Sequence, residues 1–378
     1  MNPPAGQRIE SIDATRGVTL FLILFSHCVQ SFFATHSYVG TGAADVWCMK
    51  FFDLFVFHKS MMLFALLFGL SFFFQMQKAA QQGGGSASRQ FAVRLGWLAV
   101  FGYVNGVFDR TDMLLPFALC GAVLLPFRRA PLYVLIVAAL FLLCKPPLIL
   151  SRLLDVQDHF HHFFLAHKPP APDTQTTGWV DFAAWNLWPR IPSRMCIMCL
   201  NYRIFDVPGM FLLGCCIGKW RILEPQNTRR LARVCLPAAV LLALAYAIRR
   251  YVHVPGGLFP ILQSYVDVLQ TLFYALFFTF LFRLRAMAWL CHPMAAIGKS
   301  TLSCYMSQGV ILSFLMFGWG LGWAETMPAS QKAVLAVVLF LLQMLFCVLW
   351  LKRWRLCPME ALWRHLVSRS VNASGRTG

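Results

Sequence analysis

The feature that most limits how this chain can fold is a series of apolar runs, each near the roughly 20 residues that a helix needs to cross a membrane. In the run 331–351, for example, Lys332 is the only charged residue. Because backbone inside lipid must satisfy its own hydrogen bonds, runs of this kind predict helices. We expect an all-α fold, a polytopic transmembrane helix bundle of about ten spans that forms one multipass domain over residues 1–378. The expected spans are 17–35, 55–76, 92–108, 112–127, 131–150, 205–219, 232–250, 259–282, 300–321 and 331–351.

Composition supports this class. Hydrophobic residues make up 58% of the chain and charged residues only 13%, whereas soluble domains carry roughly 25% charged residues. The formal net charge of +18 would also suit a nucleic-acid-binding protein. In a membrane protein, however, a basic excess reflects Lys and Arg gathered in cytoplasmic loops. We therefore expect the lipid bilayer, and no nucleic acid, as a partner.

The distribution of basic residues predicts the orientation. With the N-terminus inside, most Lys and Arg fall in loops on the cytoplasmic side, including the loop 283–299 and the C-terminal tail, whereas the opposite loops hold most of the acids. Arg249 and Arg250 run against this trend. The positive-inside rule then predicts an N-in, C-in topology.

Two stretches are expected outside the spans. Residues 77–91 contain "QQGGGSAS" and read as a flexible cytoplasmic linker, and residues 151–204 form the one sizeable extracytoplasmic segment. The latter contains four histidines that could ligate a metal together with Asp158, but their spacing matches no recognised site, so a solvated or interfacial loop is favoured and no metal is expected. These histidines are His159, His161, His162 and His167.

The first span carries two polar residues whose spacing places them on one face of a helix. Arg16 and His27 are eleven residues apart, which is three helical turns plus roughly 20°, so they share a face about 16 Å apart along the axis. Histidine inside lipid is costly and points into a bundle or a wet cavity. One interpretation is structural, with His27 hydrogen-bonded between helices and Arg16 anchored at the headgroups; the other is a functional site.

The eighth span carries a polar stripe that also has two interpretations. Gln263, Asp267, Gln270 and Tyr274 are spaced 4, 3 and 4 residues apart and therefore lie on one helical face. A buried Asp in a span is a functional candidate. A hydrogen-bond network between helices explains the stripe equally well.

Six segments in order resemble the YeiB family of bacterial multipass membrane proteins (domain of unknown function 418). They are "RIESIDATRGVTLFLILFSH", "HKSMMLFALLFGLSF", "GYVNGVFDRTDMLLPFALCG", "GMFLLGCCIGKW", "IGKSTLSCYMSQGVI" with "GWGLGW" after it, and "CPMEALWRHL". That family resembles the larger group of membrane acyltransferases that contains acyltransferase family 3 and the lysosomal heparan glucosamine acetyltransferase. The resemblance implies a bacterial inner-membrane protein.

The resemblance also implies site residues. Arg16, Lys59, Asp112, Tyr305 and Gln308 stand where the family has the same residue types. His27 stands where the family usually has Asn, and Asn105 where it usually has His, as if an imidazole and an amide could exchange helices within one shared cavity. Arg-x10-His also resembles the catalytic signature of acyltransferase family 3.

The implied activity is acyl transfer. Acyl-CoA, most simply acetyl-CoA, would be the cytoplasmic donor, and an extracytoplasmic or membrane-embedded molecule such as a glycan the acceptor. His27 would be the general base, because neutral imidazole is suited to that role near pH 7, with His36 as the alternative base. Asp112 and Asp109 would orient the acceptor. Arg16 would bind the CoA phosphates through bidentate contacts. Three further cations on the same side could extend this phosphate site, namely Lys299, Arg283 and Arg285.

Two other functions remain open at this stage. A proton-coupled transporter of a small or amphipathic solute would use Asp267, His27 and Arg16 for coupling and anion binding. The absence of an evident inverted repeat weighs mildly against that reading. A non-catalytic membrane scaffold is disfavoured by the polar groups inside the spans.

Overall fold

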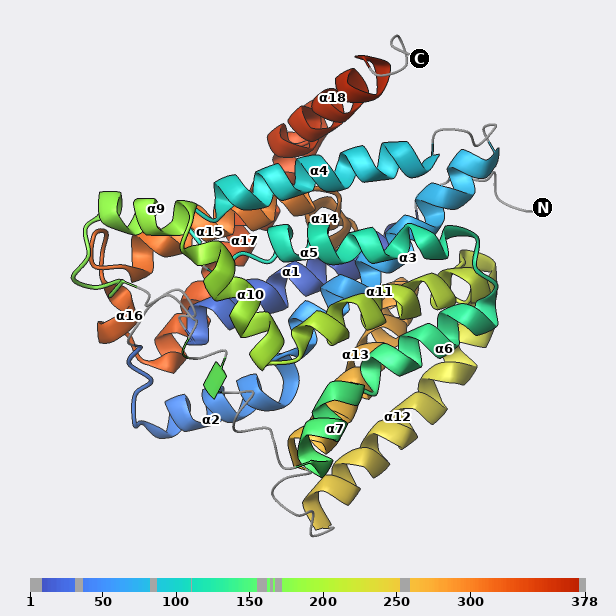
Figure 1. Cartoon of the computed structure of the whole chain (residues 1–378), viewed down its shortest axis with the longest axis horizontal. Helices are drawn as coiled ribbons and strands as arrows, with labels where there is room; N and C mark the ends of the chain where they lie inside the picture. Colours follow the sequence, from blue (N-terminus) through green and yellow to red (C-terminus); the bar gives the residue numbers. More distant parts are fainter. Residues whose placement is uncertain are drawn as a thin grey trace.

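A computed structural model describes residues 9–30, 37–81, 87–109, 111–154, 162–163, 166, 172–251 and 259–373. Over these residues the fold is all-helical, with no strand (Figure 1). The helices of the N-terminal half are α1 (Glu10–Gln30), α2 (Ala43–Phe51), a π-helix (Phe52–Val56), α3 (Lys59–Gln81), α4 (Ala87–Asn105), α5 (Leu114–Gly121), α6 (Leu132–Leu143) and α7 (Pro146–Leu153). Those of the C-terminal half are α9 (Trp179–Leu187), α10 (Arg190–Leu200), α11 (Arg203–Trp220), α12 (Thr228–Tyr251), α13 (Phe259–Leu281), α14 (Ala288–Lys299), α15 (Thr301–Met316), α16 (Trp323–Thr326), α17 (Ala329–Arg353) and α18 (Pro358–Ala373).

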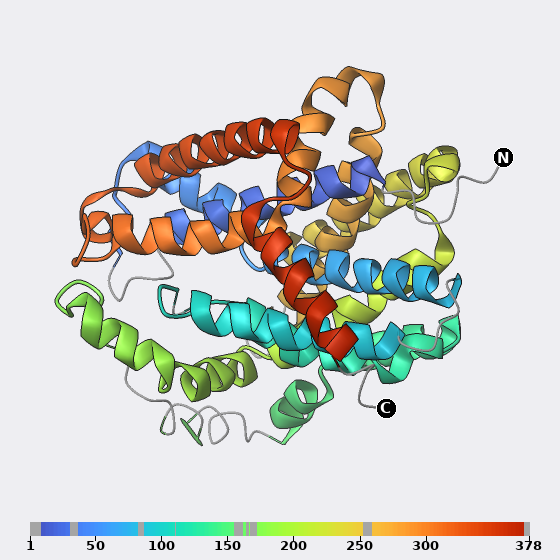
Figure 2. The same cartoon turned by 90° about the horizontal axis from the view of Figure 1, so that it is seen from above.

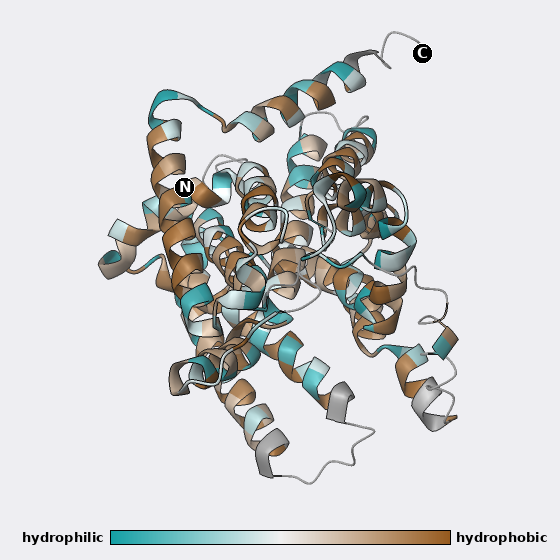
Figure 3. Cartoon of the chain, turned by 90° about the vertical axis from the view of Figure 1, so that its left-hand side faces the viewer, coloured by the Kyte–Doolittle hydropathy of each residue, from teal (hydrophilic) through white to brown (hydrophobic). Residues whose placement is uncertain are grey.

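Several helices are built to face lipid. Within the described residues, six helical segments are long and apolar enough to cross a membrane, and the bent pair α10–α11 would make a seventh. The apolar windows of α12 and α17 are only 11% and 17% buried inside the protein, and Figure 3 shows apolar residues predominating along the long helices. Apolar surface on this scale indicates contact with a membrane. The membrane bundle predicted from the sequence is therefore confirmed.

The structure divides the expected spans unevenly. The expected span at 112–127 is the short helix α5 followed by 3₁₀ turns, and the expected span at 131–150 is split between α6 and α7. The six segments that meet the length criterion are Glu10–Gln30, Ala43–Gln81, Leu132–Leu150, Pro225–Ile248, Leu262–Leu281 and Ala329–Arg353.

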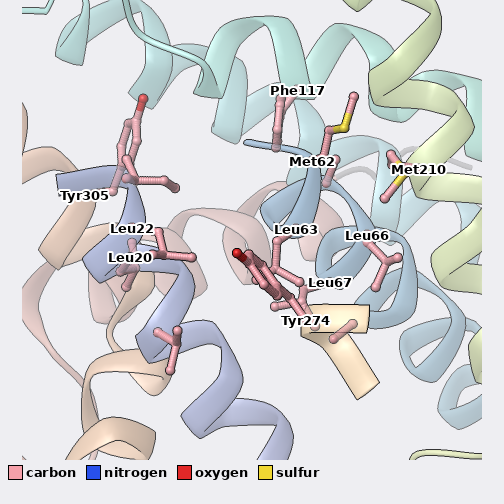
Figure 4. Packing of buried hydrophobic residues seen from close by; sticks show 14 of the residues in the cluster. Leu20, Leu22, Met62, Leu63, Leu66, Leu67, Phe117, Met210, Tyr274 and Tyr305 are labelled. Carbon is pink, nitrogen blue, oxygen red and sulfur yellow. The ribbon is translucent and has the colours of Figure 1, made fainter. Parts of the chain in front are cut away.

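The core lies where α1, α3 and α11 meet the shorter helix α5. Figure 4 shows buried side chains that these helices contribute, among them Leu22 of α1, Leu63 and Leu66 of α3, and Phe117 of α5. The α3–α11 contact is the most extensive between any two described helices. The packing of these apolar faces fixes the positions of three helix ends, namely the end of α1, the end of α4 and the start of α5. These ends carry the polar site described below.

Helix α14 is a feature that the sequence did not suggest. The stretch 283–299 was expected to be a cytoplasmic loop, but Ala288–Lys299 is helical and packs along the first half of α1. A Cβ atom added at Gly17 would lie 2.3 Å from the Met294 carbonyl oxygen, and one added at Gly298 would lie 1.8 Å from the Asp13 carbonyl oxygen. The two glycines allow the helix backbones to approach this closely, as small residues do between membrane helices.

The C-terminal segment contacts the first turn of α15. The Glu360 carboxylate of α18 accepts hydrogen bonds from the backbone N–H of Leu302, at 2.7 Å, and of Ser303, at 3.1 Å. A carboxylate at the first N–H groups of a helix satisfies orphan donors and complements the helix dipole. Helix α18 also crosses α4 (Figure 2), where the Trp97 indole donates to the Ser370 hydroxyl. The last helix thus ties α4 to α15.

The two stretches expected outside the spans are partly helical. Helix α3 runs to Gln81 and α4 begins at Ala87, so helix reaches into both ends of the proposed linker 77–91, and residues 82–86 lie outside the described residues. In the segment 151–204, the described part contains α9 and α10.

Candidate functional site

Buried and half-buried polar side chains gather where the last turns of α1 and α4 meet residues 106–109 and 111–113. His27 lies on the final turn of α1 and interacts electrostatically with Asp109 and Arg194. Asn105 is the last residue of α4, and the Asn105 carbonyl oxygen accepts a hydrogen bond from the backbone N–H of Asp109 at 3.0 Å. His27 and Asn105 therefore both lie near Asp109, although 77 residues separate them in the sequence. We call this group the outer polar cluster, and its members are His27, Asn105, Asp109, Asp112, Arg190, Arg194 and Tyr305.

Asn105 and Asp112 are joined directly. The Asn105 side-chain amide donates to Asp112 Oδ1 at 2.9 Å, and the other Asp112 oxygen accepts from the backbone N–H of Leu115 at 3.2 Å. Both residues are almost completely buried, and Asn105 Oδ1 has no hydrogen-bond partner. A buried acceptor without a partner is uncommon in proteins. This oxygen is therefore an unsatisfied acceptor inside the site.

Helix α15 closes the cluster on the other side and contacts both α1 and α4. The Tyr305 hydroxyl accepts a hydrogen bond from the backbone N–H of Met113 at 3.0 Å, and Tyr305 interacts electrostatically with Asp112. Gly309 packs against Asn105, because a Cβ atom there would lie 3.0 Å from Asn105 Oδ1. Gln308, one residue earlier, donates instead to Gln343 Oε1 of α17 at 2.9 Å. The structure thus brings Tyr305 to the cluster and directs Gln308 toward α17.

Two arginines of α10 complete the cluster. Arg190 is 2% exposed and donates through Nε to the Asn186 carbonyl at 3.2 Å and through an Nη atom to the Asp109 carbonyl at 3.4 Å. Arg194, one turn later, contacts the sulfur of Met113 and interacts electrostatically with Asp109, Asp112 and Tyr305. The cluster therefore combines an imidazole, two carboxylates and two guanidinium groups in a buried environment.

A second charged group lies beside the first. Lys59, at the start of α3, forms an ion pair with Asp267 of α13 at 2.9 Å, and Lys145 forms one with Asp206 of α11 at the same distance. All four side chains are at most 7% exposed. Asp206 interacts electrostatically with Asp267, and Arg203 interacts with both Asp206 and Arg194. Arg203 thus connects the two ion pairs to the outer polar cluster.

The polar stripe of α13 contacts the π-helix Phe52–Val56. Gln270 donates to the Leu54 carbonyl at 3.0 Å, and the Tyr274 hydroxyl donates to the Phe55 carbonyl at 3.0 Å. Gln263 donates to Asp267 Oδ1 at 2.7 Å. A π-helix leaves carbonyl groups outside the regular α-helical pattern. The stripe satisfies these carbonyls, so Gln270 and Tyr274 have a structural task, whereas Asp267 belongs to the ion pair with Lys59.

Arg16 lies on the same helix as His27, as expected, in the first half of α1. Its guanidinium donates to Asp13 Oδ1 at 2.5 Å and to the Ser71 hydroxyl of α3 at 2.7 Å, with the side chain 19% exposed. Arg283 instead donates to backbone carbonyls of Leu223 and Glu224. Lys299 ends α14 and is half-buried, and Arg285 is exposed on a 3₁₀ turn. Arg16 and Arg283 thus donate to different partners.

Other candidates from the sequence lie apart from these groups. His36, the alternative base, is outside the described residues, as are His159, His161 and His167. His162 is described and exposed. Within the described part of the chain, no group of three or more His, Cys, Asp or Glu side chains could hold a metal ion.

The cations of the segment 190–206 were not among the candidate residues expected from the sequence. Arg190 and Arg194 are four residues apart within an otherwise apolar stretch, and Arg203 and Asp206 follow at the start of α11. Charged residues spaced by one helical turn in an apolar stretch share a face, and this was the available signal. This signal received no weight because residues 151–204 were expected to form an extracytoplasmic segment.

Comparison with known proteins gives relatives over the whole length. The uncharacterized protein YxaH of Bacillus subtilis (strain 168) is 25% identical over 396 aligned positions, covering 95% of this chain and 94% of that protein. An uncharacterized 39.9 kDa protein from the amylase 3′ region of Bacillus acidopullulyticus is 23% identical over 390 positions, covering 96% and 95%. The family model described as protein of unknown function (DUF418) matches residues 217–370. This match confirms, over residues 217–370, the resemblance to that family predicted from the sequence.

Proposed function

We propose that this protein is a membrane acyltransferase of the bacterial cytoplasmic membrane that moves an acyl group, most simply acetyl, from acyl-CoA to an acceptor reached from the outer side. The observation that carries the proposal is the outer polar cluster, in which His27 interacts with Asp109 beside Asn105 and Asp112. Buried ionisable groups in a membrane protein mark functional sites by default. The relatives from Bacillus species support a bacterial origin.

The residues of the cluster suit the chemistry. A hydroxyl or amine of the acceptor attacks the thioester carbonyl, its proton passes to His27, and the CoA thiolate leaves. Asp109 holds the imidazole and stabilises the imidazolium that forms, as a carboxylate beside a catalytic histidine does. The Asn105 amide and the Tyr305 hydroxyl line the same space and position the reacting groups.

The donor would bind toward the inner ends of the helices. Arg16 lies about 16 Å from His27 along α1 by helical rise, so phosphates held at Arg16 would place the acyl end of the donor toward the outer polar cluster. Asp13 and Ser71 hold the guanidinium in one orientation, which reduces the entropy lost on binding. Lys299 and Arg285 are the further cations of this end.

Coenzyme A binding tests the donor assignment. Arg16→Ala should weaken the affinity of purified protein for acetyl-CoA by about ten- to a hundredfold, because charge-assisted hydrogen bonds contribute on the order of 1.5–3 kcal/mol. Isothermal titration with acetyl-CoA measures the effect, and Arg229→Ala, at an exposed position, is the control for loss of one charge. Equal affinities of the Arg16 variant and wild type, with an intact fold, would remove Arg16 from the site.

The proposal includes an N-in, C-in topology with ten crossings. These are α1, α3, α4, α5 with its 3₁₀ turns, α6 with α7, α11, α12, α13, α15 and α17. Helix α14 then remains on the inner side beside α1. The outer polar cluster, at the end of α1, the end of α4 and the loop before α5, falls in the outer half of the membrane.

Reporter fusions test this topology. A fluorescent protein fused after Gln81 should fluoresce, because it remains in the cytoplasm, and alkaline phosphatase fused after Thr176 should be active, because it is exported. Swapping the two reporters between these sites is the control and should give no signal from either. The topology is wrong if the same reporter is active at both positions.

A further inference from the structure

Three arginines on the proposed outer side each have a guanidinium nitrogen for which the protein supplies no hydrogen-bond acceptor. Arg190 Nη2, Arg194 Nε and Arg203 Nε are buried and have no hydrogen-bond partner. Among the described residues, none of the three guanidinium groups forms an ion pair with a carboxylate. Buried donors are normally satisfied, and each exception calls for a physical reason. We call these residues the outer arginines.

The outer arginines lie close enough to repel one another. Arg194 interacts electrostatically with Arg190 on the preceding turn and with Arg203 across the bend between α10 and α11. The two helices meet at 76°, and Tyr202 between them adopts a left-handed backbone with φ 52°. This bend brings α10 and the first residue of α11 around one region. A continuous helix would carry Arg203 away from Arg194.

The carboxylates nearby do not neutralise this charge. Asp206 is paired with Lys145, and Asp267 with Lys59. Asp112 uses its oxygens on Asn105 and Leu115, and Asp109 Oδ1 accepts from the backbone N–H and hydroxyl of Thr111, both at 2.7 Å. Three positive charges therefore face two carboxylates that are already hydrogen-bonded. Arg190 is 2% exposed, and Arg194 and Arg203 are half-buried. Keeping such an excess of like charge away from water is costly unless an anion joins it.

We propose that Arg190, Arg194 and Arg203 bind an oxyanion, a phosphate or a carboxylate, carried by the acceptor of the proposed reaction. Guanidinium groups are suited to such ligands because they are always charged and donate in a planar fork. Arg190 and Arg194 also line a small cavity together with Asp112, and both arginines belong to the outer polar cluster. The identity of the bound molecule as acceptor rests on the proposed function; the oxyanion site itself does not depend on acyl transfer.

The test measures binding without CoA, so its failure leaves the acyltransferase proposal untouched. Full-length protein is placed in phosphatidylcholine nanodiscs and titrated with inorganic phosphate at constant ionic strength. A second preparation contains phosphatidylglycerol and no phosphate. We expect one of the two anions to raise the Tm of the wild type by at least about 2 °C, because a ligand that binds only the native state stabilises it. Stabilisation by phosphatidylglycerol identifies a lipid headgroup as the source, and stabilisation by phosphate alone identifies a soluble anion.

Variants separate a built site from general charge effects. Arg194→Gln should weaken the stabilising anion at least about tenfold, whereas Arg229→Gln, at an exposed position on α12, should respond as the wild type does. Arg203→Lys keeps the charge but loses Nε, so it serves if the first variant does not fold, and it should weaken binding several-fold. The proposal is overturned if neither anion stabilises the wild type, or if the Arg194 or Arg203 variant responds as Arg229→Gln does.

Discussion

Replacing His27 by alanine is expected to lower the rate of acyl transfer by roughly 10²–10⁴-fold, the contribution of a general base, while leaving acetyl-CoA binding nearly unchanged. The reason is positional, since His27 lies at the end of α1 beside Asp109, far along the helix from Arg16. The measurement is incorporation of radiolabelled acetyl from acetyl-CoA into material of membrane vesicles, with donor affinity determined in parallel.

The matched control is His365→Ala, because His365 is exposed on α18 and lies outside the cluster. A second comparison uses the exchange of the two residues. His27→Asn combined with Asn105→His should recover part of the activity that either change removes, because an imidazole at position 105 would still face Asp112 and adjoin Asp109. A fully active His27→Ala would end the case for His27 as base.

Replacing Lys59 by methionine is expected to lower the free energy of unfolding by about 3–5 kcal/mol, because removing one partner of a buried ion pair leaves an uncompensated charge. Lys59 is 1% exposed and Asp267 5% exposed, and their charged atoms lie 2.9 Å apart. Lys59 also donates to the Asp53 carbonyl at 2.9 Å, so its loss frees part of the turn before α3. Unfolding in mixed micelles by titration with dodecyl sulfate measures the effect.

The double variant Lys59→Met with Asp267→Leu should recover most of that loss, because replacing both ions by apolar side chains removes the uncompensated charge. Arg221→Met supplies the contrast. It removes one partner of an exposed pair, in which Arg221 lies 3.7 Å from Glu224 with its side chain 57% exposed, and should cost less than about 1 kcal/mol. Similar losses from Lys59→Met and Arg221→Met would contradict the role assigned to the buried pair.

The sequence alone was sufficient for the class of fold. Apolar runs of about 20 residues report directly on helices in lipid, because hydrocarbon leaves the backbone no other partner. The same local pattern placed α13 and α17 within two residues of their observed bounds and α3 within five, whereas α1 begins at Glu10, seven residues before the expected start of the first span. The polar stripe of α13 was also readable, because helical periodicity puts residues three and four apart on one face.

The sequence was not sufficient for helices whose packing depends on distant partners. Helix α14 has only 12 residues and ends in a glycine and a lysine, so nothing local separates it from a loop. It is held by α1, through close backbone contacts at Gly17 and Gly298. The role of Glu360 could not be predicted for the same reason. Its carboxylate accepts hydrogen bonds from backbone N–H groups of α15, nearly sixty residues earlier in the chain.

For the candidate site, the sequence by itself determined which residue types stand at the helix ends. His27 was selected from its position in an apolar run, and Asn105 and Lys59 were selected from the resemblance to a known family. Only the tertiary structure decided which side chains each of these residues interacts with. Lys59 meets Asp267, Asn105 meets Asp112, and His27 meets Asp109 and Arg194. Electrostatic and hydrogen-bond partners depend on distances between helices, and those distances are set by side-chain packing across the whole bundle, which helical periodicity within one segment does not contain.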